Sequence, residues 1–189
     1  MSPQAVAAIF SFLLVFVVVG FLLVATYNSV ITLAQQASKA WANIDVALKQ
    51  RHDELPNLVE AVKGLMAFER ETLTRVTQLR AAYSSAEPIP AQAATSEATS
   101  SAVRQLFAVV ERYPDIKSQA NVLELQREIQ RLEEIIADRR ELYNDTVFRY
   151  NTRIGQFPAN TLTRLFSWAA RPFFSAPEAQ DTHGVLLTD

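Results

Sequence analysis

The longest uninterrupted hydrophobic stretch lies near the start of the chain, over residues 5–26. It reads AVAAIFSFLLVFVVVGFLLVAT, where Ser11 and Thr26 are the only polar side chains, and the first charged residue is Lys39. A helix of this length spans about 33 Å, enough to cross a hydrocarbon core of about 30 Å. The pattern predicts a short N-terminal tail, residues 1–4, followed by a transmembrane helix over residues 5–26.

A cleavable signal peptide is the alternative interpretation of the same stretch. The apolar run is longer than the usual signal-peptide core, the leader MSPQ carries no Lys or Arg, and no small-x-small cleavage site follows. These features favour an uncleaved anchor.

Beyond residue 26, apolar residues recur at spacings of three and four, which is typical of the buried face of a helix. The first such stripe comprises Trp41, Ile44, Leu48, Leu55, Leu58, Val62 and Leu65. Pro56 lacks an amide hydrogen and disfavours helical geometry at the preceding residue, so we expect a turn over residues 53–56. Asp53 can cap a second helix, whose stripe comprises Val59, Val62, Met66, Leu73, Val76 and Tyr83.

Residues 84–100, SSAEPIPAQAATSEATS, are mostly Ser, Ala, Thr, Pro and Glu and predict a surface loop. A third helix is expected to start at Ser96 and to end before Pro114, and its buried stripe comprises Val103, Leu106, Val110 and Tyr113. A fourth helix should extend from Gln119 to just before Pro158, with a stripe comprising Val122, Leu125, Ile129, Leu132, Ile136, Tyr143 and Tyr150. No strand-like alternation occurs, and no strand is predicted.

This pattern predicts an all-α fold: a single N-terminal transmembrane helix followed by an antiparallel up-down four-helix bundle with long helices, over residues 27–157. An alternative keeps the first two helices as one long helix kinked at Pro56, in a three-stranded coiled-coil hairpin.

Residues 158–174 are an aromatic C-terminal segment that includes Arg164 and Arg171, and residues 175–189 are expected to be a flexible tail. Asn160 or Thr161 can cap a short helix in the aromatic segment. Its aromatic side chains can pack on the end of the bundle or on lipid, and both arrangements stay open.

Composition and motifs argue against most kinds of chemistry. A net charge of −2 argues against nucleic-acid binding. The chain has no cysteine, its two histidines include His183 in a polar tail, and no Glu-x-x-His, phosphate-loop or dinucleotide motif occurs. We therefore expect no catalytic residue, no cofactor, no metal and no enzymatic activity.

Polar residues follow the apolar stripe of the fourth predicted helix. Glu133, Arg140, Asn144 and Asn151 are spaced by seven, four and seven residues, so they share one face. They form either a solvated row or a partly buried network, in which Arg140 pairs with Glu133 and the asparagine amides bind backbone or tyrosine groups.

Several segments resemble the LemA family of bacterial membrane proteins: YNSVITL, AWANIDVALKQRHDELPNLVEAVKG, ERYPDIKS, NVLELQREIQRLEEIIADRRELYNDTVFRYN and FP. The resemblance extends from Tyr27 to about Phe174. It implies a protein with one membrane span, a LemA-like helical bundle over residues 27–157 and no established enzymatic activity. The polar motif positions, interpreted as structural or partner-binding, are Asp45, Arg51, Asn57, Glu60, Glu111, Lys117, Glu133, Arg140, Asn144 and Asn151.

We therefore expect a scaffold or adaptor anchored in the bacterial cell membrane through residues 5–26, acting through contacts with a protein partner or with itself. One alternative is a self-assembling, membrane-shaping protein, as suggested for family relatives in magnetosome-forming bacteria. Another is an enzyme with a polar site around Arg51, Glu133 and Arg140. A leader without basic residues, followed by Lys39 on the domain side, favours an outside N-terminus and a cytoplasmic domain.

Overall fold

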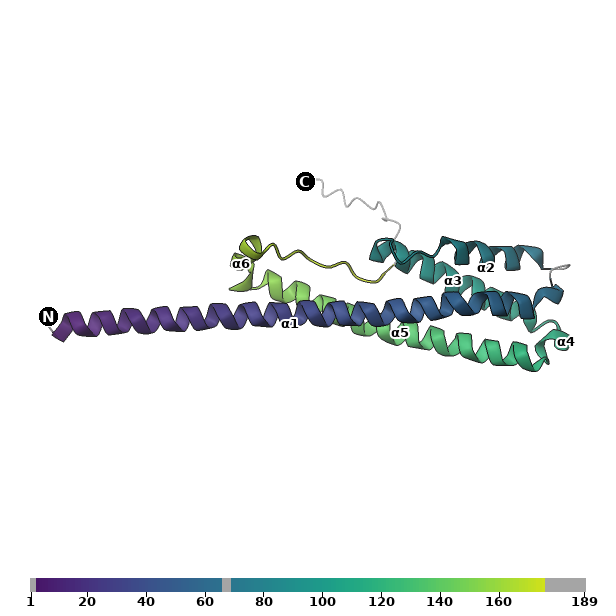
Figure 1. Cartoon of the computed structure of the whole chain (residues 1–189), viewed down its shortest axis with the longest axis horizontal. Coiled ribbons are helices and arrows are strands. Elements are labelled where there is room, and N and C mark those ends of the chain that lie inside the picture. The colour runs from purple at the N-terminus through teal and green to yellow at the C-terminus, as the bar shows by residue number, and fades with distance from the viewer. Residues whose placement is uncertain (1–2, 66–68, 176–189) are drawn as a thin grey trace, which may run out of the picture. The chain divides into compact units, whose positions relative to one another are not determined.

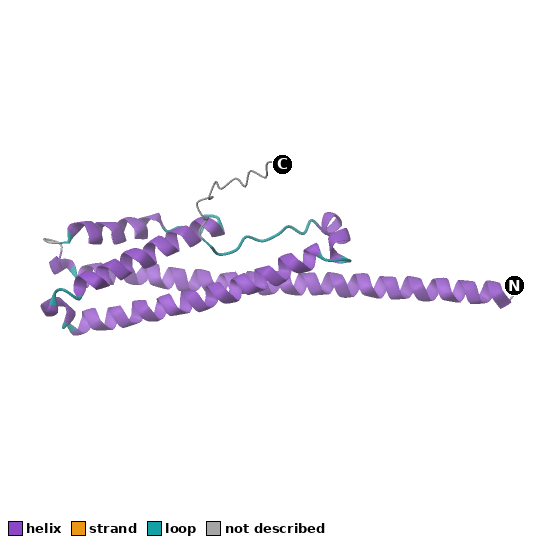
Figure 2. Cartoon of the chain, turned by 180° about the vertical axis from the view of Figure 1, so that it is seen from behind, coloured by secondary structure: helices purple, strands orange, loops and turns teal. Residues whose placement is uncertain are grey.

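The structure, a computed structural model, describes residues 3–65 and 69–175. Those residues form helices, turns and loops without a β-strand, which confirms the all-α prediction. Apart from Ser175, the predicted flexible tail lies outside the described residues. In chain order the elements are α1 (Pro3–Ala61), the 3-10 helix η1 (Lys63–Leu65), α2 (Arg70–Ala82), α3 (Ile89–Val110), α4 (Pro114–Lys117), α5 (Ala120–Gly155) and α6 (Ala159–Phe166) (Figures 1 and 2).

Helix α1 is continuous through the position where the sequence predicted a turn. The prediction of a turn over residues 53–56 is wrong, because Pro56 lies inside α1, which continues to Ala61. The apolar stripe keeps its phase across Pro56, and Leu55, Leu58 and Val62 are all buried in one core. Burial of this stripe therefore outweighs the helix-breaking preference of proline. Met66 and the side chain of Leu65 lie outside the described part of the chain.

The predicted loop over residues 84–100 is wrong beyond its first residues. Helix α3 begins at Ile89, with Pro88 at its N-cap position, and not at Ser96. The small side chains that suggested a loop allow α3 to pack closely on its neighbours, and the buried ones in this stretch include Ala93, Ser96, Thr99 and Ser100. Small polar residues favour caps and turns in isolated chains, so only the packing reveals this helix.

The chain divides into two compact units. Unit 1 comprises Met1–Ala40 and Asp145–Arg171, and unit 2 comprises Trp41–Asn144 and Pro172–Asp189, so α1 and α5 each contribute to both. A core in unit 2 draws on α1, α2, α3 and α5. Its buried members are Leu55, Leu58, Val62, Leu73, Val76, Leu79, Ala102, Val103, Leu106, Val109, Val110, Val122 and Ile129. Most of the predicted stripe residues are buried, and the half-buried ones are Trp41, Val59, Tyr83, Tyr113 and Leu125.

Unit 1 has a small core of its own around the start of α6. Its buried members are Val30, Tyr150, Ile154 and Ala159, with Leu33, Ala34 and Trp168 packed against them. Helix α6 follows Pro158, and neither Asn160 nor Thr161 is its N-cap residue, contrary to expectation.

A left-handed residue returns the chain to α1 after α6. Ser167 ends α6 with a φ of 53°, and the Trp168 N–H donates to Thr163 O at 3.1 Å. Within unit 1 the Trp168 and Phe166 rings then lie 6.0 Å and 4.9 Å from the Tyr27 ring. Part of the aromatic segment thus packs on protein.

Replacing Ile129 by Ala tests the core of unit 2. Ile129 is fully buried, so Ile129→Ala should lower the free energy of unfolding by about 2 to 5 kcal/mol. Denaturant titration of the full chain in detergent, followed by circular dichroism, measures this change. Val46→Ala is the matched control at an exposed position and should change stability by less than about 0.5 kcal/mol. Equal effects of the two substitutions would contradict the core assignment.

Candidate functional site: a polar groove between α3 and α5

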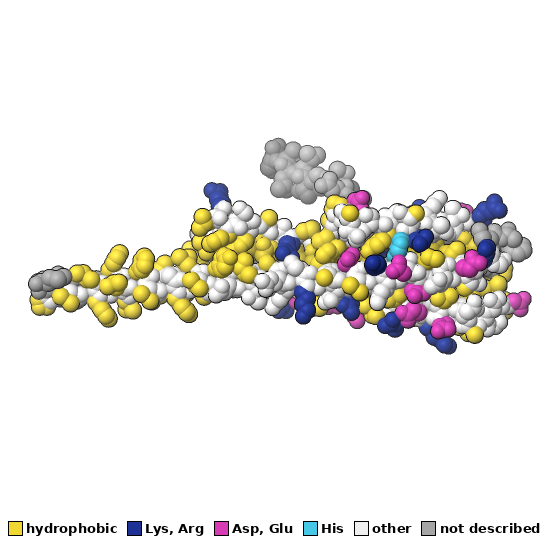
Figure 3. All heavy atoms as spheres, viewed as in Figure 1, with side chains coloured by type: hydrophobic (Ala, Val, Ile, Leu, Met, Phe, Trp, Pro, Cys, Tyr) yellow, Lys and Arg dark blue, Asp and Glu magenta, His cyan; other side chains and the backbone are white. Residues whose placement is uncertain are grey.

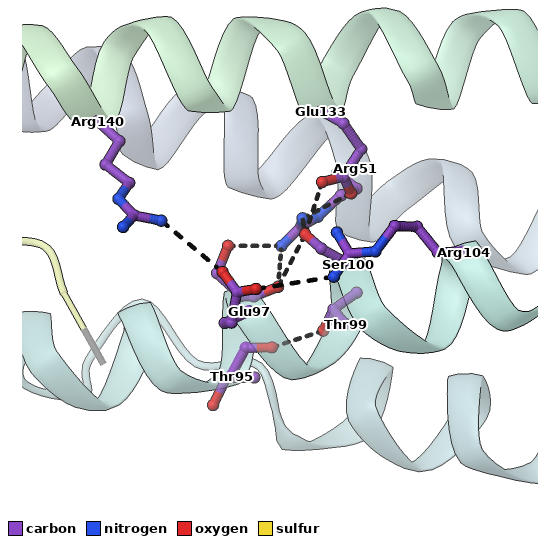
Figure 4. Close-up of polar contacts among 9 residues, drawn as sticks. Arg51, Thr95, Glu97, Thr99, Ser100, Arg104, Glu133 and Arg140 are labelled. Carbon is purple, nitrogen blue, oxygen red and sulfur yellow. Dashed lines mark hydrogen bonds and ion pairs between the residues drawn. The ribbon is translucent and has the colours of Figure 1, made fainter. Parts of the chain in front are cut away.

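A buried arginine of α1 organises the polar interior of unit 2. Arg51 is only 3% exposed. Its Nη1 donates to Ser100 Oγ and to Glu133 Oε1, both at 2.8 Å, and its Nη2 donates to Ser96 Oγ at 2.9 Å (Figure 4). Arg51 of α1 thereby links α3, which carries the serines, to α5, which carries the glutamate.

The two ends of the Arg51–Glu133 pair lie in different surroundings. The Glu133 side chain is 28% exposed, whereas that of Arg51 is 4% exposed. Ser100 Oγ donates to Glu133 Oε2 at 2.6 Å, so both carboxylate oxygens have partners. A buried charge is tolerated only when it is paired and hydrogen-bonded, and this arrangement meets both conditions.

Arg140 does not pair with Glu133, which contradicts the predicted ion pair. Arg140 Nη1 instead lies 3.7 Å from Glu97 Oε2, and both side chains are about half exposed (Figure 4). Glu97 also pairs with Arg104, again at 3.7 Å. Positions 133 and 140 are two helical turns apart, about 10.5 Å along α5, so a partner from another helix lies closer to each.

The asparagines of α5 bind backbone, as the network interpretation predicted. In unit 2, the Phe174 N–H donates to Asn144 Oδ1 at 2.8 Å, and Asn144 Nδ2 donates to Phe174 O at 3.3 Å. In unit 1, Asn151 and the backbone of Arg171 exchange the same pair of bonds, both at 2.9 Å. Each amide side chain thus satisfies both backbone groups of one residue, as a neighbouring strand would.

A tyrosine hydroxyl adds to this contact in unit 2. Tyr143 is buried, and its hydroxyl donates to Pro172 O at 2.9 Å. The Trp41 ring lies 5.6 Å from the Tyr143 ring and 5.8 Å from the Phe174 ring. Residues 172–174 are therefore held on unit 2 by both backbone hydrogen bonds and aromatic packing.

The other motif positions lie apart from Arg51 in local surface contacts. Asn57 Nδ2 donates to Glu54, and Glu60 pairs with Lys63 at 3.1 Å. Glu111 pairs with Lys117, next to α4. The structure brings none of these residues to the Arg51 network.

Asp45 contacts a tyrosine of α2's C-terminal end. The Tyr83 hydroxyl lies 3.4 Å from Asp45 Oδ1, and the His52 ring packs 5.0 Å from the Tyr83 ring. Burial, together with the neighbouring Asp45 carboxylate, raises the pKa of Tyr83 from 10.0 to about 12. The raised pKa extends to higher pH the range over which Tyr83 is protonated and can donate this hydrogen bond.

A groove of about 860 Å³ opens beside the Arg51 network. Residues of α3 and α5 line it, together with residues 174–175. Its lining comprises Ala93, Ser96, Glu97, Ser100, Arg104, Glu133, Glu134, Ile136, Ala137, Arg140, Phe174 and Ser175. We call this feature the polar groove, since charged residues of both signs contribute to it.

The charged side chains that line the polar groove differ in how many of them already have hydrogen-bond partners. Among the lining residues, Glu133 already accepts hydrogen bonds from Arg51 and Ser100 through its two carboxylate oxygens. Within the described residues no cluster of three or more His, Asp or Glu side chains could hold a metal ion. Glu97, Arg104 and Arg140 keep about half or more of their side-chain surface exposed. These three charges are available to a ligand.

Sequence reasoning missed the contribution of α3 to this site. Ser96, Glu97 and Ser100 fall where the predicted loop over residues 84–100 overlaps the expected start of the third helix at Ser96, and they were not singled out, although Ser96 and Ser100 have the i, i+4 spacing of one helix face. That spacing was the available signal.

These observations define a class of protein: a chain of helices with one candidate membrane span and a polar network in its interior. Among the described residues, α1 is the one helix long and apolar enough to cross a membrane. Residues 40–185 match the model of the LemA family, and the chain belongs to that family.

Relatives from two groups of bacteria match most of the chain. Magnetosome protein MamQ 2 of Paramagnetospirillum magneticum is 24% identical over 182 aligned residues, which cover 82% of this chain and 67% of the relative. Protein LemA of Metamycoplasma hominis is 25% identical over 182 aligned residues, covering 94% of this chain and 83% of the relative. Neither name denotes an enzyme. The family and the apolar helix together support a membrane-associated protein.

Breaking the Arg51 pair should destabilise the protein strongly. Arg51→Leu leaves Glu133 without its cation, which should cost about 3 to 5 kcal/mol of unfolding free energy. Adding Glu133→Gln should recover part of that loss, because the remaining side chain carries no charge. Denaturant titration of the full chain in detergent measures both variants.

Arg140→Leu is the matched control for this experiment. It removes an exposed, long ion pair and should cost about 0 to 1 kcal/mol. A neutral Arg51→Leu variant, or an equally damaging Arg140→Leu variant, would contradict the assignment of Arg51 as the central charge.

Proposed function

We propose that this LemA-family protein is a membrane-anchored adaptor that binds a protein partner through the polar groove. In this proposal residues 5–26 span the membrane, and residues 27–157 form an antiparallel four-helix bundle that presents the groove. The exposure of the large apolar side chains from Val6 to Val24 supports the span, since lipid would cover them. The shared core of α1, α2, α3 and α5 supports the bundle.

The observation that carries the partner site is that non-helical backbone of this chain lies in the lining of the groove. Phe174 and Ser175 line the groove, and Asn144 holds the Phe174 backbone through two hydrogen bonds. A groove beside α5, where a side-chain amide already binds non-helical backbone, is suited to bind the backbone of a partner segment as well. The proposed partner is therefore an extended segment of a protein, and not a small-molecule substrate.

The charges of the groove indicate which segment would fit. Arg104 and Arg140 flank Glu97 at 3.7 Å each, a distance at which exposed ion pairs are weak. A partner carboxylate can therefore bind either arginine, because breaking the weak ion pair with Glu97 costs little free energy. Glu134, also in the lining, offers a site for a basic side chain. A segment carrying both signs of charge matches this pattern.

Site-specific photocrosslinking in native membranes tests this adaptor role. A photoreactive phenylalanine analogue in place of Arg104 should crosslink the full-length protein to a defined protein. The same analogue in place of Gln130, exposed on α5 outside the groove, should not. Adding Glu97→Lys to this variant should lower the yield of crosslinks from position 104 about fivefold or more, equivalent to roughly 1 kcal/mol of binding free energy.

The controls separate the possible outcomes. Glu124→Lys changes the same charge outside the groove and should leave the yield unchanged. A crosslinked second copy of this chain would indicate self-association through the same groove. Equal yields at Arg104 and Gln130, or no crosslink at either position, would overturn the adaptor proposal.

We propose further that the N-terminus lies outside the bacterial cell membrane and the domain lies in the cytoplasm. The leader contains no Lys or Arg, whereas Lys39 follows the apolar stretch, and positive charge favours the cytoplasmic side.

Single engineered cysteines measure this orientation, because the chain has none of its own. In intact spheroplasts a membrane-impermeant maleimide should label Gln4→Cys and leave Gln130→Cys unlabelled until the cells are lysed. The reverse pattern would place the domain outside.

A further inference from the structure

Unit 1 contains a cleft with purely apolar walls, separate from the polar groove. It measures about 350 Å³, within the usual size range of ligand pockets of about 300 to 1,000 Å³. Leu23, Val24 and Tyr27 of α1 form one wall, and Leu162, Leu165 and Phe166 of α6 form the other. Every one of these side chains belongs to unit 1.

The spacing of α6 explains why its apolar side chains face this cleft. Leu162, Leu165 and Phe166 stand at positions i, i+3 and i+4, so they form one face of the helix, and Arg164 projects from the opposite face. The contact between Phe166 and Tyr27 holds α6 against α1 at one end of that face. The remaining apolar surface stays open, and Leu165 is 75% exposed.

The α1 wall of the cleft identifies what fills it. Leu23 and Val24 belong to the apolar stretch over residues 5–26, whose other large side chains are exposed along the helix (Figure 3). If that stretch spans a membrane, the cleft opens at the edge of the hydrocarbon layer, where acyl chains are the apolar groups at hand. Tyr27 stands at the position where interfacial aromatic residues occur.

Charge on unit 1 indicates the kind of lipid. Outside the apolar stretch this unit carries Lys39, Arg149, Arg153, Arg164 and Arg171, against the single acidic residue Asp145. Asp145 pairs with Arg149 at 3.0 Å. Within the described residues Arg164 has no acidic partner, although it lies on the helix that forms the cleft. An anionic headgroup would supply one.

We propose that the cleft between α6 and the end of the apolar stretch binds an acyl chain of an anionic phospholipid, and that anionic headgroups of the same leaflet lie beside Arg164 on the opposite face of α6. This inference rests on the proposed membrane span of residues 5–26. It makes α6 a second membrane attachment, whose affinity depends on the lipid composition of the adjoining leaflet.

Photocrosslinking from lipid tests this site in the full chain. The protein is reconstituted in nanodiscs of phosphatidylglycerol or of phosphatidylcholine, each with a trace of the same lipid carrying a diazirine on its acyl chain. After irradiation, mass spectrometry locates the adducts. We expect adducts on residues 21–27 and 159–166, in addition to adducts along residues 9–20, and a higher yield on α6 in phosphatidylglycerol.

Two variants connect the adducts to the cleft and to the headgroup. Leu165→Gln replaces an exposed wall residue and should lower the α6 yield about tenfold, relative to the yield on residues 9–20, because apolar burial is lost. Arg164→Gln should reduce the preference for phosphatidylglycerol about fivefold, as expected for one charge near the membrane surface. Arg127→Gln, an exposed arginine of α5 in unit 2, is the matched control and should preserve the preference.

The adducts on residues 9–20 separate failure of the cleft from failure of the span. Adducts there without adducts on α6 would overturn the lipid cleft and leave the span intact. An absence of adducts at both places would overturn the span and the cleft together. If Leu165→Gln leaves the adduct yield on α6 unchanged, the contact is nonspecific and lipid binding in the cleft is contradicted. If Arg164→Gln leaves the preference for phosphatidylglycerol unchanged, the assignment of the headgroup to Arg164 is contradicted.

Discussion

The burial of Arg51 is the constraint on which unit 2 depends. A guanidinium that is almost inaccessible to water requires acceptors for its donors and a compensating negative charge. Ser96 and Ser100 of α3 and Glu133 of α5 supply these groups, so α1, α3 and α5 can meet in one register only. Such a network adds little net stability compared with an apolar core, but misaligned helices would leave a charge unpaired. The same network also contributes polar side chains to the lining of the neighbouring groove.

The C-terminal part of the chain uses helical side chains in place of a neighbouring strand. Asn144 and Asn151 each satisfy both backbone groups of one residue in a segment that forms no helix or sheet. Buried or half-buried backbone without partners is costly, so these amides allow residues near 171 and 174 to run along α5. In unit 2 this arrangement brings Phe174 into the protein interior and to the edge of the polar groove. The contact is the basis for proposing an extended peptide as the partner.

The two units differ in the surfaces that they offer to other molecules. Unit 1 combines the apolar stretch, the apolar face of α6 and an excess of basic side chains, which suits a lipid surface. Unit 2 carries charges of both signs around a groove, which suits a protein segment. One chain therefore carries the chemistry for two kinds of contact, and each is built from residues of its own unit.

The sequence by itself determined the helical class, the apolar stretch, the membership in the LemA family and most of the buried stripe positions. The family membership follows from the resemblance of particular motif segments, and the other properties follow from composition and periodic spacing, which local residues specify. The tertiary structure alone decided that α1 continues through Pro56, that α3 begins at Ile89 and that Glu133 pairs with Arg51. In each case the preferences of neighbouring residues in the sequence favoured a different arrangement. Contacts between residues distant in the chain outweighed these preferences. The partner of Glu133 is 82 positions away, and spacing along one helix carries no information about a neighbour from another.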